Sequence, residues 1–202
     1  SAGQRYVQAK GGSSRAAASA TSGRAVTAGV GSFLSSVASQ GLKASLDALG
    51  LADVVGKSAM SVLAAIADRI APAGNTVEEA AARRAANDVI EKLYRLCDEA
   101  GGDLGALEQM TEEDVRQALH ESAASYVYHR WAEELGLRIE QGAVSAASAV
   151  ALERQMRDYS RERVTNLLSD RDPLSVDWAG KEGSAITKTV YEEAYRLLEV
   201  GE

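Results

Sequence analysis

Two histidines, His120 and His129, are the side chains of this sequence best suited to acid–base chemistry or to binding a metal ion. Glu121 and Glu133 stand near them in the chain and could supply carboxylate ligands. The separation of nine residues, however, places the two imidazoles on opposite sides of a straight helix, so that one helix cannot bring both to one ion. We therefore expect no metal site here and interpret both as core-edge or surface histidines.

The stretch Val55-Gly56-Lys57-Ser58 ends like a phosphate-binding loop. That motif needs four residues between its two glycines, whereas five separate Gly50 from Gly56, and no predicted strand leads into it. No serine, cysteine or lysine lies in a recognisable nucleophile setting, and the turn of a nucleophile elbow is missing. We predict instead that Gly56 breaks a helix and that Ser58 caps the next one. We expect no catalytic residue, cofactor or enzymatic activity.

The segment from Arg171 to Trp178 combines a proline, two aspartates, an arginine and a tryptophan within eight residues. It could be a structural clasp, in which Trp178 anchors the loop and Asp172 or Asp177 accepts backbone hydrogen bonds. It could also bind a partner, because tryptophan and arginine on a rigid loop are typical of interface hot spots. Both interpretations stay open, and the candidate partner-binding residues are Phe33, Leu34, Arg171, Asp172, Pro173, Asp177 and Trp178.

The elements that must position these residues are all predicted to be helices. No segment alternates β-branched residues over five positions between turn signals. Thr76-Val77-Glu78-Glu79 is a capping box, and Thr111-Glu112-Glu113-Asp114 is a similar helix start with acids at the positive end of the helix dipole. The fold class is therefore all-α, an irregular or orthogonal bundle of about five to seven helices. Apolar spacing places them at about 22–49, 53–70, 76–100, 111–135, 145–169 and 184–199.

Glycines weaken the first of these helices. Gly23, Gly29 and Gly31 each cost a helix up to about 1 kcal/mol relative to alanine. This segment therefore needs a partner surface to hold it, and its small residues would let another backbone approach closely.

Composition and charge divide the chain unevenly. The formal charge is −7, yet residues 1–46 contain five basic residues and no acidic one. Because the first residues are also rich in Gly, Ser and Ala, we predict a flexible basic arm over 1–22 and a single helical domain over 23–202. Five charges over 46 residues are too dilute to favour nucleic acid.

The single cysteine, Cys97, allows no internal disulfide, which fits a reducing cytoplasm. No apolar run approaches the roughly 18 residues of a membrane-spanning helix. We therefore expect a cytoplasmic protein that does not bind a membrane.

Four segments of the sequence share a family pattern: Lys10-Gly11-Gly12-Ser13-Ser14-Arg15-Ala16, Ser22-Gly23-Arg24-Ala25-Val26-Thr27-Ala28-Gly29, Val55-Gly56-Lys57-Ser58-Ala59 and Arg171–Trp178. Together they resemble the QatB family, a component of the bacterial Qat anti-phage system. The resemblance implies neighbours that include an ATPase, QatA, a QueC-like enzyme, QatC, and a TatD-like nuclease, QatD. It implies that this chain forms a heterodimer with the QueC-like enzyme, with QatA and QatD as further candidate partners.

The resemblance also implies a role for the amino terminus. QueC-like enzymes use ATP to build a nitrile on a deazaguanine, and the defence variants are thought to attach a deazaguanine to a partner's terminal glycine, which begins a flexible tail. Because the chain begins Ser1-Ala2-Gly3, no modified residue is assigned.

Two functions follow for comparison. The first is a non-enzymatic defence component that binds the QueC-like enzyme and is its N-terminally modified substrate. The second is a membrane-active or secreted effector that inserts the Gly/Ala-rich segment 25–49, led by Phe33 and Leu34.

Overall fold

The computed structural model describes residues 2–140 and 172–200, together with residues 147, 150, 151 and 154. These residues form α-helices and short 3-10 helices and contain no strand, which confirms the all-α fold class. Of the predicted helix 145–169, all but residues 147, 150, 151 and 154 lie outside the described residues. The elements are α1 (Ala2–Ala9), α2 (Ser13–Ser19), α3 (Thr21–Gln40), α4 (Leu42–Ala48), η1 (Ala52–Val54), α5 (Ala59–Ile70), α6 (Val77–Glu99), η2 (Leu104–Gln109), α7 (Glu112–Glu140) and α9 (Lys181–Val200).

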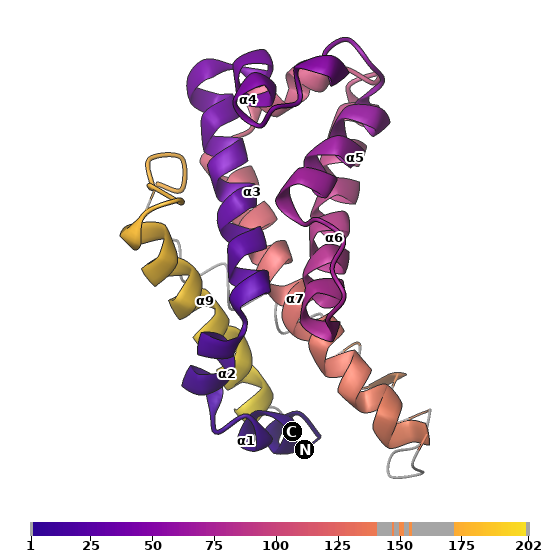
Figure 1. The fold of residues 1–202 in the computed structure, drawn as a ribbon, viewed down its shortest axis with the longest axis vertical. Coiled ribbons are helices and arrows are strands. Elements are labelled where there is room, and N and C mark those ends of the chain that lie inside the picture. Colours follow the sequence, from indigo (N-terminus) through magenta and orange to yellow (C-terminus); the bar gives the residue numbers. More distant parts are fainter. Residues whose placement is uncertain (1, 141–146, 148–149, 152–153, 155–171, 201–202) are drawn as a thin grey trace.

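Helix α3 lies at the centre of the bundle. It contacts α6 and α7 on one side and α9 on the other, and it also touches α4, α5 and η2. Figure 1 shows α9 and the α5–α6 pair on opposite sides of α3, with α7 behind it. One hydrophobic core joins these helices, and its small alanines, such as Ala82 and Ala86 on α6, let the helices pack closely.

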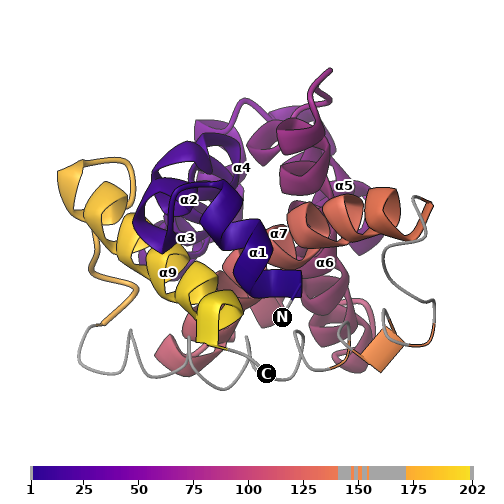
Figure 2. The same cartoon turned by 90° about the horizontal axis from the view of Figure 1, so that it is seen from below.

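The segment predicted as a flexible arm is helical in most of its described residues. Residues 2–19 form α1 and α2, which both pack against α9, as Figure 2 shows from below. Tyr6, Val7, Ala16 and Ala17 are buried in the same core as the rest of the chain. Alanine has the highest helix propensity, and its small side chain allows close approach, so an Ala-rich segment that meets a partner helix becomes ordered.

Glycine also divides the segment predicted as one helix over 22–49. Gly41 adopts a φ of 82°, in the left-handed region, and separates α3 from α4. Gly56 has a φ of 83°, and the Ser58 hydroxyl accepts a hydrogen bond from the Ser61 amide (3.3 Å) at the start of α5. The predicted break at Gly56 and cap at Ser58 are therefore confirmed, although α5 begins six residues later than the expected position 53.

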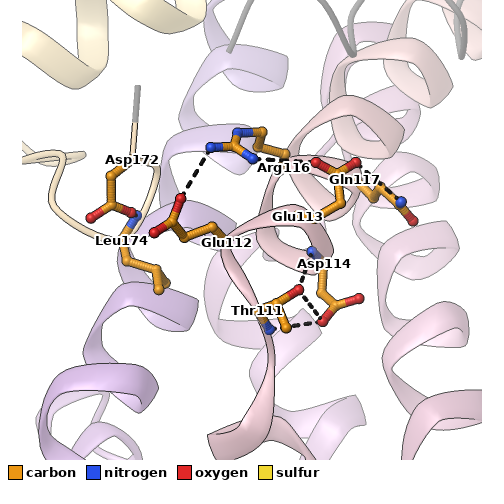
Figure 3. Close-up of polar contacts among 8 residues, drawn as sticks. All are labelled: Thr111, Glu112, Glu113, Asp114, Arg116, Gln117, Asp172 and Leu174. Atoms are coloured by element: carbon orange, nitrogen blue, oxygen red, sulfur yellow. Dashed lines mark hydrogen bonds and ion pairs between the residues drawn. The ribbon is translucent and has the colours of Figure 1, made fainter. Parts of the chain in front are cut away.

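Both predicted capping motifs are confirmed. Thr76 Oγ1 accepts from the Glu79 amide (3.1 Å), and Glu79 Oε2 accepts from the Thr76 amide (2.9 Å). The Thr76 hydroxyl also donates to Glu79 Oε2 (2.7 Å), and this bond, followed by the one from the Thr76 amide, holds the pKa of the Glu79 carboxyl below its usual value. At the start of α7, Thr111 Oγ1 accepts from the Asp114 amide (3.2 Å), and Asp114 Oδ2 accepts from the Thr111 amide (2.7 Å; Figure 3). Local hydrogen bonding thus fixes where α6 and α7 begin.

Two other helices receive their caps from distant acidic residues. Neither Ala20 nor Gly41, the residues that precede α3 and α4, has a side chain that could cap a helix. Glu78 of α6 instead accepts from the Ser22 amide (2.8 Å), and Glu108 of η2 accepts from the Leu42 amide (2.7 Å). Each carboxylate therefore accepts a hydrogen bond from an amide that has no partner within its own helix. Its negative charge also stabilises the positive end of that helix dipole.

Candidate functional site

The most specific contacts in the described chain lie along one face of α3. Gly23, Thr27 and Gly31 follow one another at intervals of four residues, which places them on one side of the helix. A Cβ atom at Gly23 would lie 2.6 Å from the Tyr126 ring of α7, and one at Gly31 would lie 2.5 Å from the ring of Trp178. The missing side chains of these two glycines therefore make room for aromatic rings. From the sequence we had expected the backbone of another helix to approach this face.

Thr27, between the two glycines, belongs to a buried hydroxyl network. Its Oγ1 lies 2.7 Å from Ser122 Oγ of α7 and 3.0 Å from Tyr191 OH of α9. All three side chains are buried, and burial raises the pKa of Tyr191, so its hydroxyl keeps its proton. The Tyr191 ring also packs on that of Tyr126, with ring centroids 5.4 Å apart. The network ties three helices together, and its only sequence signal is a threonine midway between two glycines on one helical face.

Replacing Thr27 with valine should lower the free energy of unfolding by about 1–3 kcal/mol, because two buried hydroxyls would lose their shared partner. Thr189→Val is the matched control, since Thr189 is exposed and its hydroxyl donates only within α9, to the carbonyl of Ala185. We expect the control to change stability by less than about 0.5 kcal/mol. Urea denaturation followed by circular dichroism measures both. Equal effects of the two substitutions would mean that the network does not stabilise the fold.

The loop before α9 is held by several hydrogen bonds. Trp178 is buried, and its Nε1–H donates to the carbonyl of Pro173 (2.8 Å), which also accepts from the Ser35 hydroxyl of α3 (3.2 Å). Asp172 Oδ1 accepts from the Leu174 amide (2.8 Å; Figure 3), and Asp177 Oδ1 accepts from the Gly180 amide (3.1 Å). These are the contacts that the clasp interpretation requires.

The seven residues predicted to contact a partner differ in exposure. Phe33, Leu34 and Trp178 are buried in the core, and Pro173 is also buried. Asp172 and Asp177 are exposed at the surface of the loop. Arg171 lies outside the described residues. The structure thus leaves two exposed carboxylates on a loop whose apolar residues face inward.

The two histidines occupy different environments. His129 is half-buried, and its Nε2 lies 2.9 Å from Asp88 Oδ2 of α6. His120 is only 4% exposed, and its Nε2 has no hydrogen-bond partner among the described residues. Burial lowers the pKa of His120 to about 4, so its imidazole is neutral at pH 7. No three His, Cys, Asp or Glu side chains among the described residues form a group that could hold a metal ion.

Charged side chains at the start of α7 pair with one another. Arg116 Nη2 lies 3.2 Å from Glu112, and its Nη1 lies 3.2 Å from Glu113 (Figure 3). Both pairs lie within one turn of α7, where they add to the favourable interaction of acids with the helix dipole. These acidic residues therefore have an ordinary structural role.

The fold and these contacts define an all-α protein whose buried polar groups hold helices together. None of its helices, within the ranges described, is long and apolar enough to cross a membrane. A family described as Qat anti-phage system associated protein QatB matches residues 11–198, and the chain belongs to this family. No curated protein and no solved structure matches the chain. Membership makes it a component of an anti-phage defence system.

Proposed function

We propose that this chain is a non-enzymatic component of its defence system that binds a QueC-like, ATP-dependent enzyme and is the protein substrate that this enzyme modifies at the amino terminus. The observation that carries the proposal is the family match over residues 11–198. The chemistry of the partner comes from the resemblance of the Gly/Ser-rich and Arg171–Trp178 segments to that family. In this proposal the helical body docks the enzyme, and the first helices present the terminus.

Two features of the structure are compatible with this division of roles. Helix α1 lies at one end of the molecule (Figures 1 and 2), where a large enzyme can approach the amino-terminal segment. Arg5, Lys10 and Arg15 are exposed on and between α1 and α2 and would favour an acidic surface on the enzyme.

Co-expression of the chain with the QueC-like enzyme tests the proposal. We expect the two proteins to elute together from gel filtration as a heterodimer. We also expect intact mass spectrometry to show a mass increase of the chain only when it is made with the enzyme, and fragmentation to place that increase in the amino-terminal peptide. Separate elution together with an unchanged mass would refute the proposal.

We place part of the contact on the exposed carboxylates of the loop. Asp172→Asn with Asp177→Asn removes both charges but keeps the oxygen atoms that accept from the Leu174 and Gly180 amides. We expect this double variant to bind the enzyme at least about tenfold more weakly, because each lost charge contact contributes about 1 kcal/mol or more. Asp98→Asn with Glu99→Gln, two exposed acids at the end of α6, is the matched control and should bind normally. Equal affinities of the two double variants would remove the loop from the interface.

A further inference from the structure

Three exposed cationic side chains, Arg5, Lys10 and Arg15, lie on α1, on α2 and at the turn between them. Residues 1–46 contain no acidic residue, and none of the three cations forms an ion pair with a described residue. On α6, by contrast, every basic side chain has an acidic partner. The charges on α1 and α2, which we call the cationic surface, are therefore available to a partner outside the chain. The ion pairs of α6 are Arg83–Asp68, Arg84–Glu133, Lys92–Glu121 and Arg95–Glu91.

Local structure holds two of these cations against the turn. Gly11 and Gly12 have φ values of 83° and 95°, which allow the chain to change direction between the two helices. The Arg15 side chain lies back across this turn, since a Cβ on Gly11 would be 2.8 Å from Arg15 Cδ. Lys10 Nζ lies 5.7 Å from the centroid of the buried Tyr6 ring, within reach of a cation–π interaction. Side chains that are already held in place lose less conformational entropy when a partner binds.

Acidic side chains of α9 leave the cationic surface unpaired. The Oε1 atom of Glu199 would lie 3.8 Å from a Cβ on Gly12, but Glu199 forms no ion pair with any of the three cations. Glu192 and Glu193 both pair with Arg196 of their own helix. Among the described side chains, the turn between α1 and α2 therefore keeps an excess of positive charge.

The surroundings of the cationic surface indicate the chemistry of its partner. A membrane would need exposed apolar side chains beside the charges, but Tyr6 and Val7 of α1 and Ala16 and Ala17 of α2 are buried. Tyr6 is the only aromatic residue of these two helices, so no exposed ring can stack on the bases of single-stranded nucleic acid.

Charge also favours a short partner segment over a long polyanion. Residues 1–46 carry five positive charges and the whole chain carries −7, so residues 47–202 carry −12. A long nucleic acid that extended beyond α1 and α2 would be repelled by this acidic remainder. A short run of carboxylates on a protein fits within the cationic surface and can accept two parallel hydrogen bonds from a guanidinium group.

We infer that the cationic surface is a docking site for an acidic segment of a partner protein, whose glutamate or aspartate side chains pair with Arg5, Lys10 and Arg15. Helix α1 and the loop of residues 172–178 lie at opposite ends of α9 (Figure 1), so this docking site is separate from that loop. The inference rests on the proposed function only for the identity of the partner, because the QueC-like enzyme is the protein expected to carry the acidic segment.

A rhodamine-labelled peptide with five glutamates in a glycine and serine background is the probe, and the same peptide with glutamine for glutamate is its control. Fluorescence anisotropy at low ionic strength should show that the glutamate peptide binds the full chain at least about tenfold more tightly than the glutamine peptide. Added salt should weaken this binding, because it screens exposed charges.

Replacement of the three cations tests the position of the site. The triple variant Arg5→Gln, Lys10→Gln and Arg15→Gln should bind the glutamate peptide at least about tenfold more weakly than the natural chain. The matched control removes the same charge from three exposed lysines that lie outside α1 and α2, and it should weaken binding by less than about twofold. Circular dichroism checks that both triple variants keep their helical content. The control substitutions are Lys43→Gln, Lys57→Gln and Lys181→Gln.

Failure of the glutamate peptide to bind, or equal losses in the two triple variants, would overturn the inference. Tighter binding of a single-stranded oligothymidine than of the glutamate peptide would also overturn it, because the surface would then recognise phosphate. If the α1–α2 triple variant does not fold, Arg5→Gln alone should still weaken peptide binding at least about twofold, and an unchanged affinity would contradict the inference. These measurements do not involve the QueC-like enzyme, so their failure leaves the proposed function to its own test.

Discussion

Replacing Trp178 with alanine is expected to lower the free energy of unfolding by about 3–5 kcal/mol, the usual cost of removing a large buried aromatic side chain. The indole fills the space above Gly31 of α3, and its Nε1–H anchors the loop through the carbonyl of Pro173. Without it, the segment that connects to α9 loses the contact of the ring with Gly31 of α3. Urea denaturation of both proteins, followed by circular dichroism, measures the difference.

A substitution of Gly31, the residue on which the Trp178 ring packs, tests this contact more strictly. In the natural chain Gly31→Ala should destabilise by about 1–3 kcal/mol, because the new Cβ would overlap the Trp178 ring. In the Trp178→Ala background that ring is missing, and Gly31→Ala should instead stabilise the helix by up to about 1 kcal/mol. Gly136→Ala of α7 is the control, since a Cβ there meets nothing within 4 Å, and it should be stabilising in both backgrounds. If Gly31→Ala has the same effect with and without Trp178, the proposed packing of the ring on Gly31 is incorrect.

Acid should destabilise the fold through His120. The pKa of its buried imidazole is lowered from 6.5 to about 4, so the unfolded chain binds a proton in a pH range where the folded chain does not. Stability that is fully present above about pH 6.5 is therefore lost as the pH falls toward 4, by on the order of 3 kcal/mol. Burial is the main cause, and the nearby charges of Glu113, Arg116 and Lys92 contribute less.

Comparison with His120→Leu isolates this effect from the titration of carboxylates, which both proteins share. The free energy of unfolding of the natural chain should fall relative to the variant between pH 6.5 and 4, and an NMR titration should show His120 neutral at pH 5. Parallel pH profiles for the two proteins would show that His120 does not titrate differently in the folded and unfolded states.

Several local features could be predicted from the sequence because residues within four positions of one another determine them. The capping box at Thr76, the similar helix start at Thr111 and the cap at Ser58 follow from hydrogen bonds between a side chain and an amide three residues away. The all-α class follows from helical spacing, and the family from short segments spread along most of the chain.

Other features depend on contacts that no local pattern contains. The segment predicted as a flexible arm is helical because Tyr6 and Val7 find a place in the core beside α9. Glu78 and Glu108 cap helices 56 and 66 residues away from them in the chain. Burial of His120, which sets its pKa, also results from packing between helices.

The sequence by itself determined that this protein is helical, where several of its helices begin, and to which family it belongs. Only the tertiary structure decided what each helix face meets. The ring of Trp178, from the loop before α9, packs on Gly31, and the Thr27 hydroxyl is hydrogen-bonded to that of Tyr191, 164 residues further along the chain. The physical reason is that a glycine or threonine on a helix shows only that space or a hydroxyl is available, whereas its partner is selected by the packing of the whole core.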